Sequence, residues 1–479
     1  MRIRTCALIP TLALSAALPL AAQQASRARK RMPPPNPAAQ IPAQPIAASV
    51  ADGFTVAAVG DLIMAHPQMS AGDAAFSPVA KLIQGADVGF GNLENTLINR
   101  SSFPGGPAAE NGGGDENGPP SIAPDLKKMG FEMLGHANNH DTDWGLAGME
   151  ATDRVMDKAG IVHAGTGRDL AVARAPRYLE TRWGRIALVA TTSSFEPMEP
   201  AGAPLGEALG RPGVNTLGTT LYHIVTRPQL DALRQIYDAQ PERPRRPLPA
   251  DAKGFTLFGV HYRLGPAEAL HYTMSPYDLS GILKGIREGK EDANFEIVYI
   301  HAHQPGNWSP LPADFLQPFA HDAIDAGADE FVASGPHRLR GIEIYKGKPI
   351  FYSLGNFFFE LDDLEMTTPG WMLRYGLNPA LTTDSEYEQY HLRHNFHAPY
   401  WYQSVVAVTQ FEHGTLSEIR LYPVDLGYHR IPQDRGVPHL AAPEEARQIL
   451  ERLQTLSAPY GTKIEIEGSV GIIRVGPTP

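Results

Sequence analysis

The chain has 479 residues, 43% of them hydrophobic, and its formal net charge at neutral pH is −11. This length and apolar content allow a large buried core, in one big domain or in two to three smaller ones. An acidic chain argues against nucleic-acid partners, which require a basic surface, but says little about small substrates.

Residues 1–22 have the pattern of a secretory signal peptide. Arg2 and Arg4 precede an apolar run, Cys6–Leu20, and small residues follow it at a cleavage position. The run is shorter than the ~20 residues that a membrane span requires. We therefore expect export to the periplasm or cell envelope, with a retained N-terminal anchor as the alternative. The only cysteine, Cys6, would leave with the signal, so we expect no disulfide.

Composition divides the remainder into three stretches. Residues 23–50 are rich in Pro, Ala and Gln and predict a disordered linker. Residues 51–360 predict the main domain. Residues 361–479 predict a loop insertion, then C-terminal strands and a helix that complete the same domain. The sequence thus predicts a single large domain after an exported leader.

From Phe54 onward, short apolar runs repeatedly end in polar clusters, as expected for buried strands that lead into loops. These runs lie at 54–61, 86–94, 130–140, 185–193, 296–303 and 330–337. Helices are predicted between them at Pro78–Gln84, Ala123–Lys128, Leu146–Ala159 and Pro318–Ala326. This alternation predicts an α/β fold with much parallel sheet, whose functional residues gather at the carboxyl ends of the strands.

Further elements are expected towards the C-terminus, together with three long loops. Residues 402–426 predict two strands joined at His413–Gly414, followed by a helix at Pro443–Leu456 and a short strand around Lys463–Ile466. The loops are predicted at 104–120, 241–251 and 361–400 because these segments are rich in Gly, Pro or aperiodic polar residues.

Carboxylates, amides and imidazoles lie where the predicted strands end. In chain order they are Asp61, Asn92, Glu94, Asn138, Asn139, His140, Asp141, His301, His303 and His337. Each alone has an ordinary interpretation, such as an Asx turn, a helix cap or a hydrogen-bonded histidine pair. Together they suit one or two divalent metal ions with mixed oxygen and nitrogen ligands, and a metal-activated water as nucleophile.

Five segments resemble successive motifs of the CapA family, which is named for the synthesis of poly-γ-glutamate capsules. They are VGDLIMAH (59–66), ADVGFGNLENTL (86–97), ANNHDTDWGLAGM (137–149), HAGTG (163–167) and GADEFVASGPHRLRGIEIYKGKPIFYSLGNFFFE (327–360). The resemblance runs from about Phe54 to Glu360, and the last segment is the most specific.

The CapA family is similar in fold to calcineurin-like metallophosphoesterases, which implies a four-layer α/β/β/α sandwich with one or two divalent ions (Mn, Zn, Fe or Mg). By that likeness His140 would face the substrate as an acid or transition-state donor, oriented by Asp141. Glu94 would stand in the bridging position between metals. The implied metal ligands are Asp61, Glu94, Asn139, His301 and His337.

The chain departs from the phosphoesterase pattern where Ile63 and Gly335 replace expected imidazoles. The site would then hold a single metal, or a second only when substrate is present. His303 and Asn92 are further candidate ligands. Arg338 and Arg340 are candidates to clamp an anionic group, with a pair of surface arginines as the alternative.

The resemblance implies an exported metal-dependent hydrolase in the synthesis, export or trimming of poly-γ-glutamate or another anionic envelope polymer. Its partners would be that polymer or a small anionic substrate, and envelope polymer-synthesis machinery. The alternatives are a non-catalytic polymer-binding or assembly protein and a general periplasmic phosphoesterase. The residues specify neither the bond that is cleaved nor the oligomeric state.

Overall fold

A computed structural model describes residues 49–69, 72–108, 116–240, 249, 251–361 and 368–475. The predicted signal peptide and almost all of the predicted linker at 23–50 lie outside the described residues. Parts of the loops predicted at 104–120, 241–251 and 361–400 also lie outside them. In the part of the chain that is described, no helix has the length and apolar character needed to cross a membrane.

The first sheet contains ten of the described strands. Its centre is parallel, because β1 pairs with β2, β2 with β5 and β5 with β6 in the same direction. In order across the sheet the strands are β23 (Glu465–Glu467), β24 (Val470–Arg474), β21 (Thr415–Asp425), β20 (Gln403–Glu412), β1 (Phe54–Ile63), β2 (Val88–Leu93), β5 (Phe131–Gly135) and β6 (Val162–Ala164), with β19 (Asn356–Phe359) paired to β1 and β22 (His439–Leu440) paired to β21.

The second sheet contains six described strands, and its four inner strands are parallel. The two outer strands run antiparallel to their neighbours. In order the strands are β17 (Ile342–Tyr345), β18 (Lys348–Phe351), β16 (Glu330–Ser334), β15 (Phe295–His301), β9 (Gly184–Thr192) and β8 (Arg177–Thr181).

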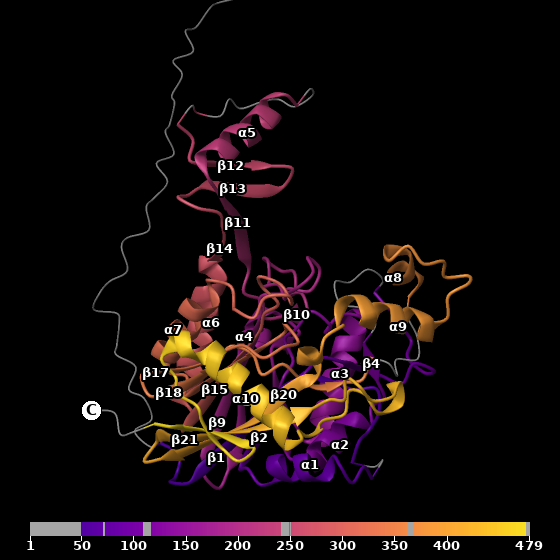
Figure 1. Ribbon diagram of the computed structural model, residues 1–479, viewed down its shortest axis with the longest axis vertical. Coiled ribbons are helices and arrows are strands. Elements are labelled where there is room, and N and C mark those ends of the chain that lie inside the picture. Colours follow the sequence, from indigo (N-terminus) through magenta and orange to yellow (C-terminus); the bar gives the residue numbers. More distant parts are fainter. Residues whose placement is uncertain are drawn as a thin grey trace, which may run out of the picture. The chain divides into compact units, whose positions relative to one another are not determined.

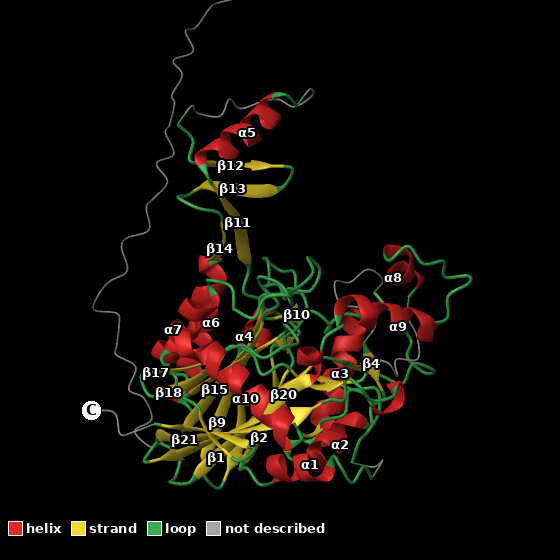
Figure 2. Cartoon of the chain, in the orientation of Figure 1, coloured by secondary structure: helices red, strands yellow, loops and turns green. Residues whose placement is uncertain are grey.

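Helices cover the outer faces of both sheets (Figures 1 and 2). The first sheet packs against α1 (Ser77–Gln84), α2 (Ile122–Met129) and α3 (Gly145–Ala159). The second packs against α6 (Pro276–Glu291) and α7 (Leu316–Ala326).

The two sheets face each other across a shared apolar core. Alternate residues of one strand point to opposite sides, so Val56 of β1 lies in the core between the sheets while Ala57 lies under the helices. Ile297 and Val298 of β15 divide in the same way. Helix α10 (Pro443–Ser457) adds Ile449 to the core between the sheets. The predicted four-layer α/β/β/α sandwich is therefore confirmed.

The predicted strands and helices from Phe54 to the C-terminus correspond to observed elements with small differences at their ends. The C-terminal strands β20 and β21 meet at His413 and Gly414, which both have positive φ, 52° and 71°. The polar segment 361–400, predicted as a loop, contains the helices α8 (Pro369–Arg374) and α9 (Asp384–Asn395). A capping box of Thr383 and Glu386 starts α9.

A four-stranded sheet between β9 and α6 was not foreseen. Its strands are β12 (Gly254–Leu257), β13 (Val260–Leu264), β11 (Thr219–Val225) and β14 (Ala269–Met274), and it carries α5 (Arg227–Asp238). The remaining short elements are β3 (Thr96–Leu97), β4 (Asn117–Gly118), β7 (Thr166–Gly167), α4 (Leu170–Arg174), β10 (Gly213–Val214), η3 (Pro399–Tyr402), η4 (Pro432–Asp434) and η5 (Ala458–Tyr460).

One core carboxyl predicts how the stability of the fold depends on pH. Glu330 of β16 is fully buried, and Thr409 Oγ1 donates to its Oε2 at 2.8 Å. Burial raises the pKa of Glu330 to about 8. Between its ordinary pKa and about 8, the folded chain binds one proton more than the unfolded chain, so the free energy of unfolding falls as pH rises.

Glu330→Gln should remove this dependence. Between pH 5 and 8.5, the wild type should lose on the order of a few kcal/mol of stability relative to the variant, measured by urea unfolding. The exposed Glu150→Gln serves as control. Parallel pH profiles for the wild type and Glu330→Gln would show that Glu330 is charged in the folded protein.

Candidate metal centre

The carboxyl ends of parallel strands from both sheets meet at one rim. In the first sheet, Asp61 of β1 lies beside Asn92 of β2, and in the second His301 of β15 lies beside Ser334 of β16. Asn92 Nδ2 is 2.9 Å from Asp61 Oδ1 and 3.3 Å from His301 Nδ1. The two sheets therefore bring their polar strand ends into direct contact.

Glu94 follows β2 and is 0% exposed. Neither of its carboxylate oxygens accepts a hydrogen bond from any described residue. His301 Nε2 lies 3.4 Å and His140 Nε2 3.7 Å from Glu94 Oε1. Burial, and then the nearby Asp61 charge, raise the pKa of Glu94 well above its usual range. A buried carboxylate without donors is costly unless a cation neutralises it.

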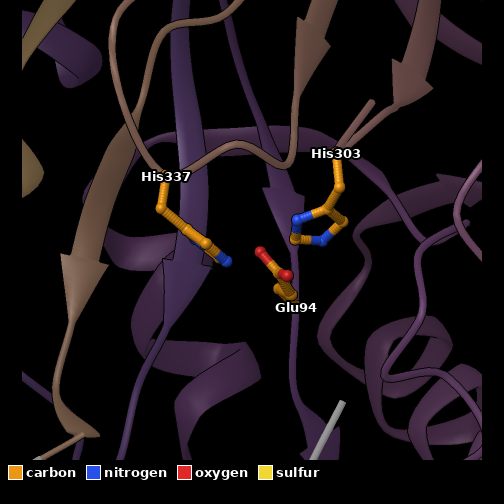
Figure 3. A group of neighbouring side chains, drawn as sticks. All are labelled: Glu94, His303 and His337. Atoms are coloured by element: carbon orange, nitrogen blue, oxygen red, sulfur yellow. The ribbon is translucent and has the colours of Figure 1, made fainter. Parts of the chain in front are cut away.

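Two groups of ligand atoms share Glu94. One contains Asp61 and His301, the other His303 and His337, and within each group the ligand atoms lie within 4.8 Å of one another. Figure 3 shows the rings of His303 and His337 directed towards the Glu94 carboxylate. Glu94 is thus placed to contact metal ions in either group, as a bridging carboxylate would.

The three imidazoles around Glu94 are held in the neutral form that binds metals. Burial lowers the pKa of His301 well below its usual value, that of His303 to about 3 and that of His337 to about 4. His301 Nε2 and His303 Nε2 are 3.0 Å apart, and His337 Nδ1 lies 2.9 Å from Asn356 Oδ1. Two carboxylates and three neutral imidazoles fit a divalent transition ion.

The two positions without imidazoles have physical explanations. Gly335 has φ 113°, and a Cβ there would lie 2.9 Å from Ala302 N and 3.2 Å from His301 Nε2. The peptide N–H of Gly335 instead donates to Asp61 Oδ2 at 3.2 Å, while the hydroxyl of Ser334 donates to Asp61 Oδ1. Ile63 is buried in the core beneath the helices of the first sheet.

His140 is oriented by two carboxylates that we did not predict. Its Nδ1 lies 2.8 Å from Asp143 Oδ2 and 2.8 Å from Glu116 Oε2. Burial alone lowers the pKa of His140, but Glu116 and Asp143 outweigh it and raise the pKa well above its usual value. The two carboxylates therefore favour the protonated form of His140 and fix its Nδ1 proton.

Asp141, which we expected to orient His140, has other partners. Its Oδ1 lies 3.0 Å from His136 Nε2, and its Oδ2 accepts the Asn138 N–H at 2.7 Å. The expectation fails because the turn after β5 directs Asp141 away from the ring of its neighbour. The spacing of His140 and Asp143 could have signalled the true partner, whereas Glu116 lies in a segment predicted to be a mobile loop.

Of the remaining candidates Asn139, Arg338 and Arg340, only Asn139 contacts an imidazole of the centre. Asn139 Oδ1 is 3.0 Å from His303 Nε2. Arg340 is 0% exposed, and its guanidinium contacts backbone carbonyls of the loop after β15 at 3.4–3.5 Å. Arg338 lies over the ring of Tyr400 at 4.2 Å and donates to Trp308 O at 3.0 Å. Both arginines thus contact the walls rather than the ligand atoms.

A cavity of about 710 Å³ opens beside the centre. Its floor includes Asn139, His140, His303 and His337. Its walls come largely from the unforeseen helices α8 and α9 and from η3, and are rich in aromatic side chains. The aromatic lining residues are Phe195, Trp308, Phe359, Trp371, Tyr375, Tyr387, Phe396, Tyr400 and Trp401.

Comparison with known proteins gives matches over most of the chain. Residues 55–361 match the family model described as "Bacterial capsule synthesis protein PGA_cap". "Uncharacterized protein y4sH" of Sinorhizobium fredii is 47% identical over 440 residues, which cover 90% of this chain and 95% of that protein.

More distant matches have names that describe a role. "PGA biosynthesis protein CapA" of Bacillus subtilis is 25% identical over 72% of this chain and 69% of its own length. "Capsule biosynthesis protein CapA" of Bacillus anthracis is 26% identical over 56% of this chain and 46% of its own length.

The unpartnered Glu94 carboxylate predicts a metal-dependent gain in stability. Micromolar Mn²⁺ or Zn²⁺ should raise the melting temperature of the wild-type protein by several degrees. Glu94→Gln keeps the shape but removes the charge, so its Glu94 centre should bind the metal about 100-fold more weakly or worse, and the variant should gain less stability than the wild type. Thermal unfolding and metal content by mass spectrometry give both readouts.

Glu196→Gln is the matched control, because Glu196 lines the same cavity outside both ligand groups. Equal metal content in the wild type and Glu94→Gln would contradict the assignment of Glu94 as a ligand.

Proposed function

The chain belongs to the PGA_cap family of bacterial capsule synthesis proteins, and from that premise we propose that it is a metal-dependent hydrolase of the cell envelope. Its substrate would be poly-γ-glutamate or another anionic polymer, cleaved during synthesis, export or trimming. The names of the Bacillus relatives support a role in making such a polymer. The signal-peptide pattern of residues 1–22 supports an exported protein.

The Glu94 carboxylate is the observation that carries this proposal. It is fully buried, has no hydrogen-bond donor among the described residues, and lies beside the neutral imidazoles of the second sheet. A protein stabilised only by packing gains nothing from such a group, whereas a cation-binding centre requires it. The residues that would hold one or two ions are Asp61, Glu94, His301, His303 and His337, with Asn139 beside His303.

A divalent ion bound there would supply a Lewis acid and make a water molecule acidic enough to attack at neutral pH. The carboxylate of Asp61 is held for this task by Asn92, Ser334 and Gly335, which leave it little freedom to turn. Burial of the centre strengthens each electrostatic contact with the substrate.

His140 would protonate the leaving group. Glu116 and Asp143 both face its Nδ1, so the second proton of the imidazolium is on Nε2. The ring lines the cavity, and Nε2 lies on the side of Glu94. An imidazolium held in one orientation next to the reacting bond is suited to general acid catalysis, which contributes about 10²–10⁴-fold to rate.

The cavity walls supply groups suited to an anionic chain. Arg374 and three histidines, His391, His394 and His397, line the cavity along with the aromatic rings. A guanidinium and imidazoles bind carboxylates or phosphates, and the rings exclude water from an extended substrate. These features support a polymer with repeated negative charges over a neutral one.

A non-catalytic binding role is the second candidate, and one observation favours it. Ile63 and Gly335 provide no imidazole, so the centre has fewer nitrogen ligands than the phosphoesterase pattern. In that case the cavity would hold the polymer for an assembly partner without cleaving it.

His140→Gln distinguishes the two roles. If the protein is a hydrolase, this change should lower kcat on poly-γ-glutamate about 10²–10⁴-fold while the bound metal remains. Chain length after incubation, measured by gel filtration, reports cleavage, and a chromogenic phosphate ester tests the phosphoesterase alternative.

His413→Gln, an exposed histidine paired with Asp52, is the control and should have wild-type kcat. Metal-loaded wild-type protein that binds poly-γ-glutamate but cleaves neither substrate would leave only the binding role.

A further inference from the structure

A further group of ligand atoms, separate from the two groups that share Glu94, lies close to the loop that carries Asn139 and His140. It consists of His136, at the end of β5, Asp153 in α3 and His163 in β6. The parallel pairing of β5 with β6 places Leu134 opposite His163 and brings the two histidines to the same edge. Their rings approach edge to face, with centroids 6.2 Å apart.

The Nδ1 atoms of both histidines face one carboxylate oxygen. His136 Nδ1 lies 2.9 Å and His163 Nδ1 3.5 Å from Asp153 Oδ1. Thr166 Oγ1 donates to the same oxygen at 2.8 Å and so fixes the carboxylate. These two nitrogens and this oxygen all lie within 4.8 Å of one another and form the candidate site.

The outer nitrogens of both rings face further carboxylates. His136 Nε2 is 3.0 Å from Asp141 Oδ1, and His163 Nε2 is 3.2 Å from Asp157 Oδ1. A carboxylate on the far nitrogen fixes the tautomer of a metal-binding histidine and raises its basicity. Both Nδ1 atoms therefore remain directed at Asp153 Oδ1.

His163 Nδ1 gives independent evidence for a ligand at this candidate site. The side chain is only 10% exposed, and no described residue makes a hydrogen bond to this nitrogen. A buried nitrogen without a partner is unfavourable. Because the atom faces Asp153 rather than solvent, a ligand between them would satisfy it.

We propose that His136 Nδ1, His163 Nδ1 and Asp153 Oδ1 bind a zinc-class divalent ion at a site separate from the Glu94 centre. Tetrahedral Zn²⁺ with bonds of about 2.0–2.1 Å places neighbouring ligand atoms roughly 3.3 Å apart. The distances of 2.9 and 3.5 Å lie on either side of this value. Two imidazoles favour Zn²⁺ or Co²⁺ over Mg²⁺ or Ca²⁺, which prefer oxygen ligands.

A proton on His136 Nδ1 competes with the metal ion for this site. Burial lowers the pKa of His136, but Asp141 and Asp153 outweigh it and raise the pKa to about 10. Bound Zn²⁺ would replace the proton on Nδ1, which would pass to solvent. The ion would also brace the loop of the Glu94 centre, because the other oxygen of Asp141 accepts the Asn138 N–H at 2.7 Å.

Zinc stoichiometry of the full chain tests this site. Metal-stripped protein is incubated with Zn²⁺, passed through gel filtration and counted for metal by mass spectrometry. His163→Ala should carry one zinc fewer than the wild type, whereas Glu94→Gln should keep this zinc. Asp157→Asn, a change at an exposed supporting carboxylate, should weaken binding about 10-fold. His413→Ala is the matched surface control.

Cobalt gives a second readout that does not depend on activity. Co²⁺ bound by two imidazoles and a carboxylate in tetrahedral geometry absorbs visible light, and the band should persist in Glu94→Gln and vanish when His163→Ala is added to that variant. Because His163 lies on β6, an edge strand of the first sheet, its removal should leave the fold intact even if Asp153→Asn does not fold. Identical zinc content and cobalt spectra for the wild type and His163→Ala would overturn the proposal and leave His136 as an imidazolium between carboxylates.

Discussion

The organising constraint is the burial of Asp61 and Glu94 at the rim where two parallel sheets meet. Parallel pairing fixes which side chains emerge together at the strand ends, so the carboxylates cannot move apart to reach water. Asp61 is compensated by three donors, whereas Glu94 has none in the described part of the chain. The charged form of Glu94 is stable only with a cation nearby, and the neutral imidazoles of the second sheet provide ligands for one.

Burial and nearby charges also set the protonation states of the histidines around this centre. His140 stays protonated inside the protein because Glu116 and Asp143 both face its Nδ1. Acids lie farther from the three histidines beside Glu94, with His301 3.4 Å from Glu94 and 3.8 Å from Asp61, and burial favours their neutral form. Histidines a few ångströms apart are thereby divided into a proton donor and metal ligands. The aromatic cavity above them is built by a segment outside the two sheets, so the substrate can vary without changes to the sandwich.

The pattern of apolar strands that stop at polar clusters, as β1 does at Asp61, predicted an α/β fold with much parallel sheet, and the resemblance to the CapA family implied the four-layer sandwich. The sequence also predicted which residues would meet, since parallel strands end at one edge. It did not predict contacts within loops: Asp141 and Asp143 lie one and three residues after His140, and only the turn after β5 directs Asp143 to the His140 ring. The mixed polar composition of 361–400 hid α9, although its Thr383–Glu386 capping box was readable. The small sheet around β11 is half-exposed and lacks the buried runs that marked the other strands.

Above all, we propose that the carboxylate of Glu94 is a metal ligand. Its most direct test is anomalous X-ray scattering from a crystal of the mature protein grown with Mn²⁺. We expect a peak about 2.0–2.3 Å from a Glu94 oxygen and within bonding distance of at least two of the imidazoles of His301, His303 and His337. A Glu94 side chain that is well ordered with no peak beside it, at a Mn²⁺ concentration that saturates other sites, would contradict the claim.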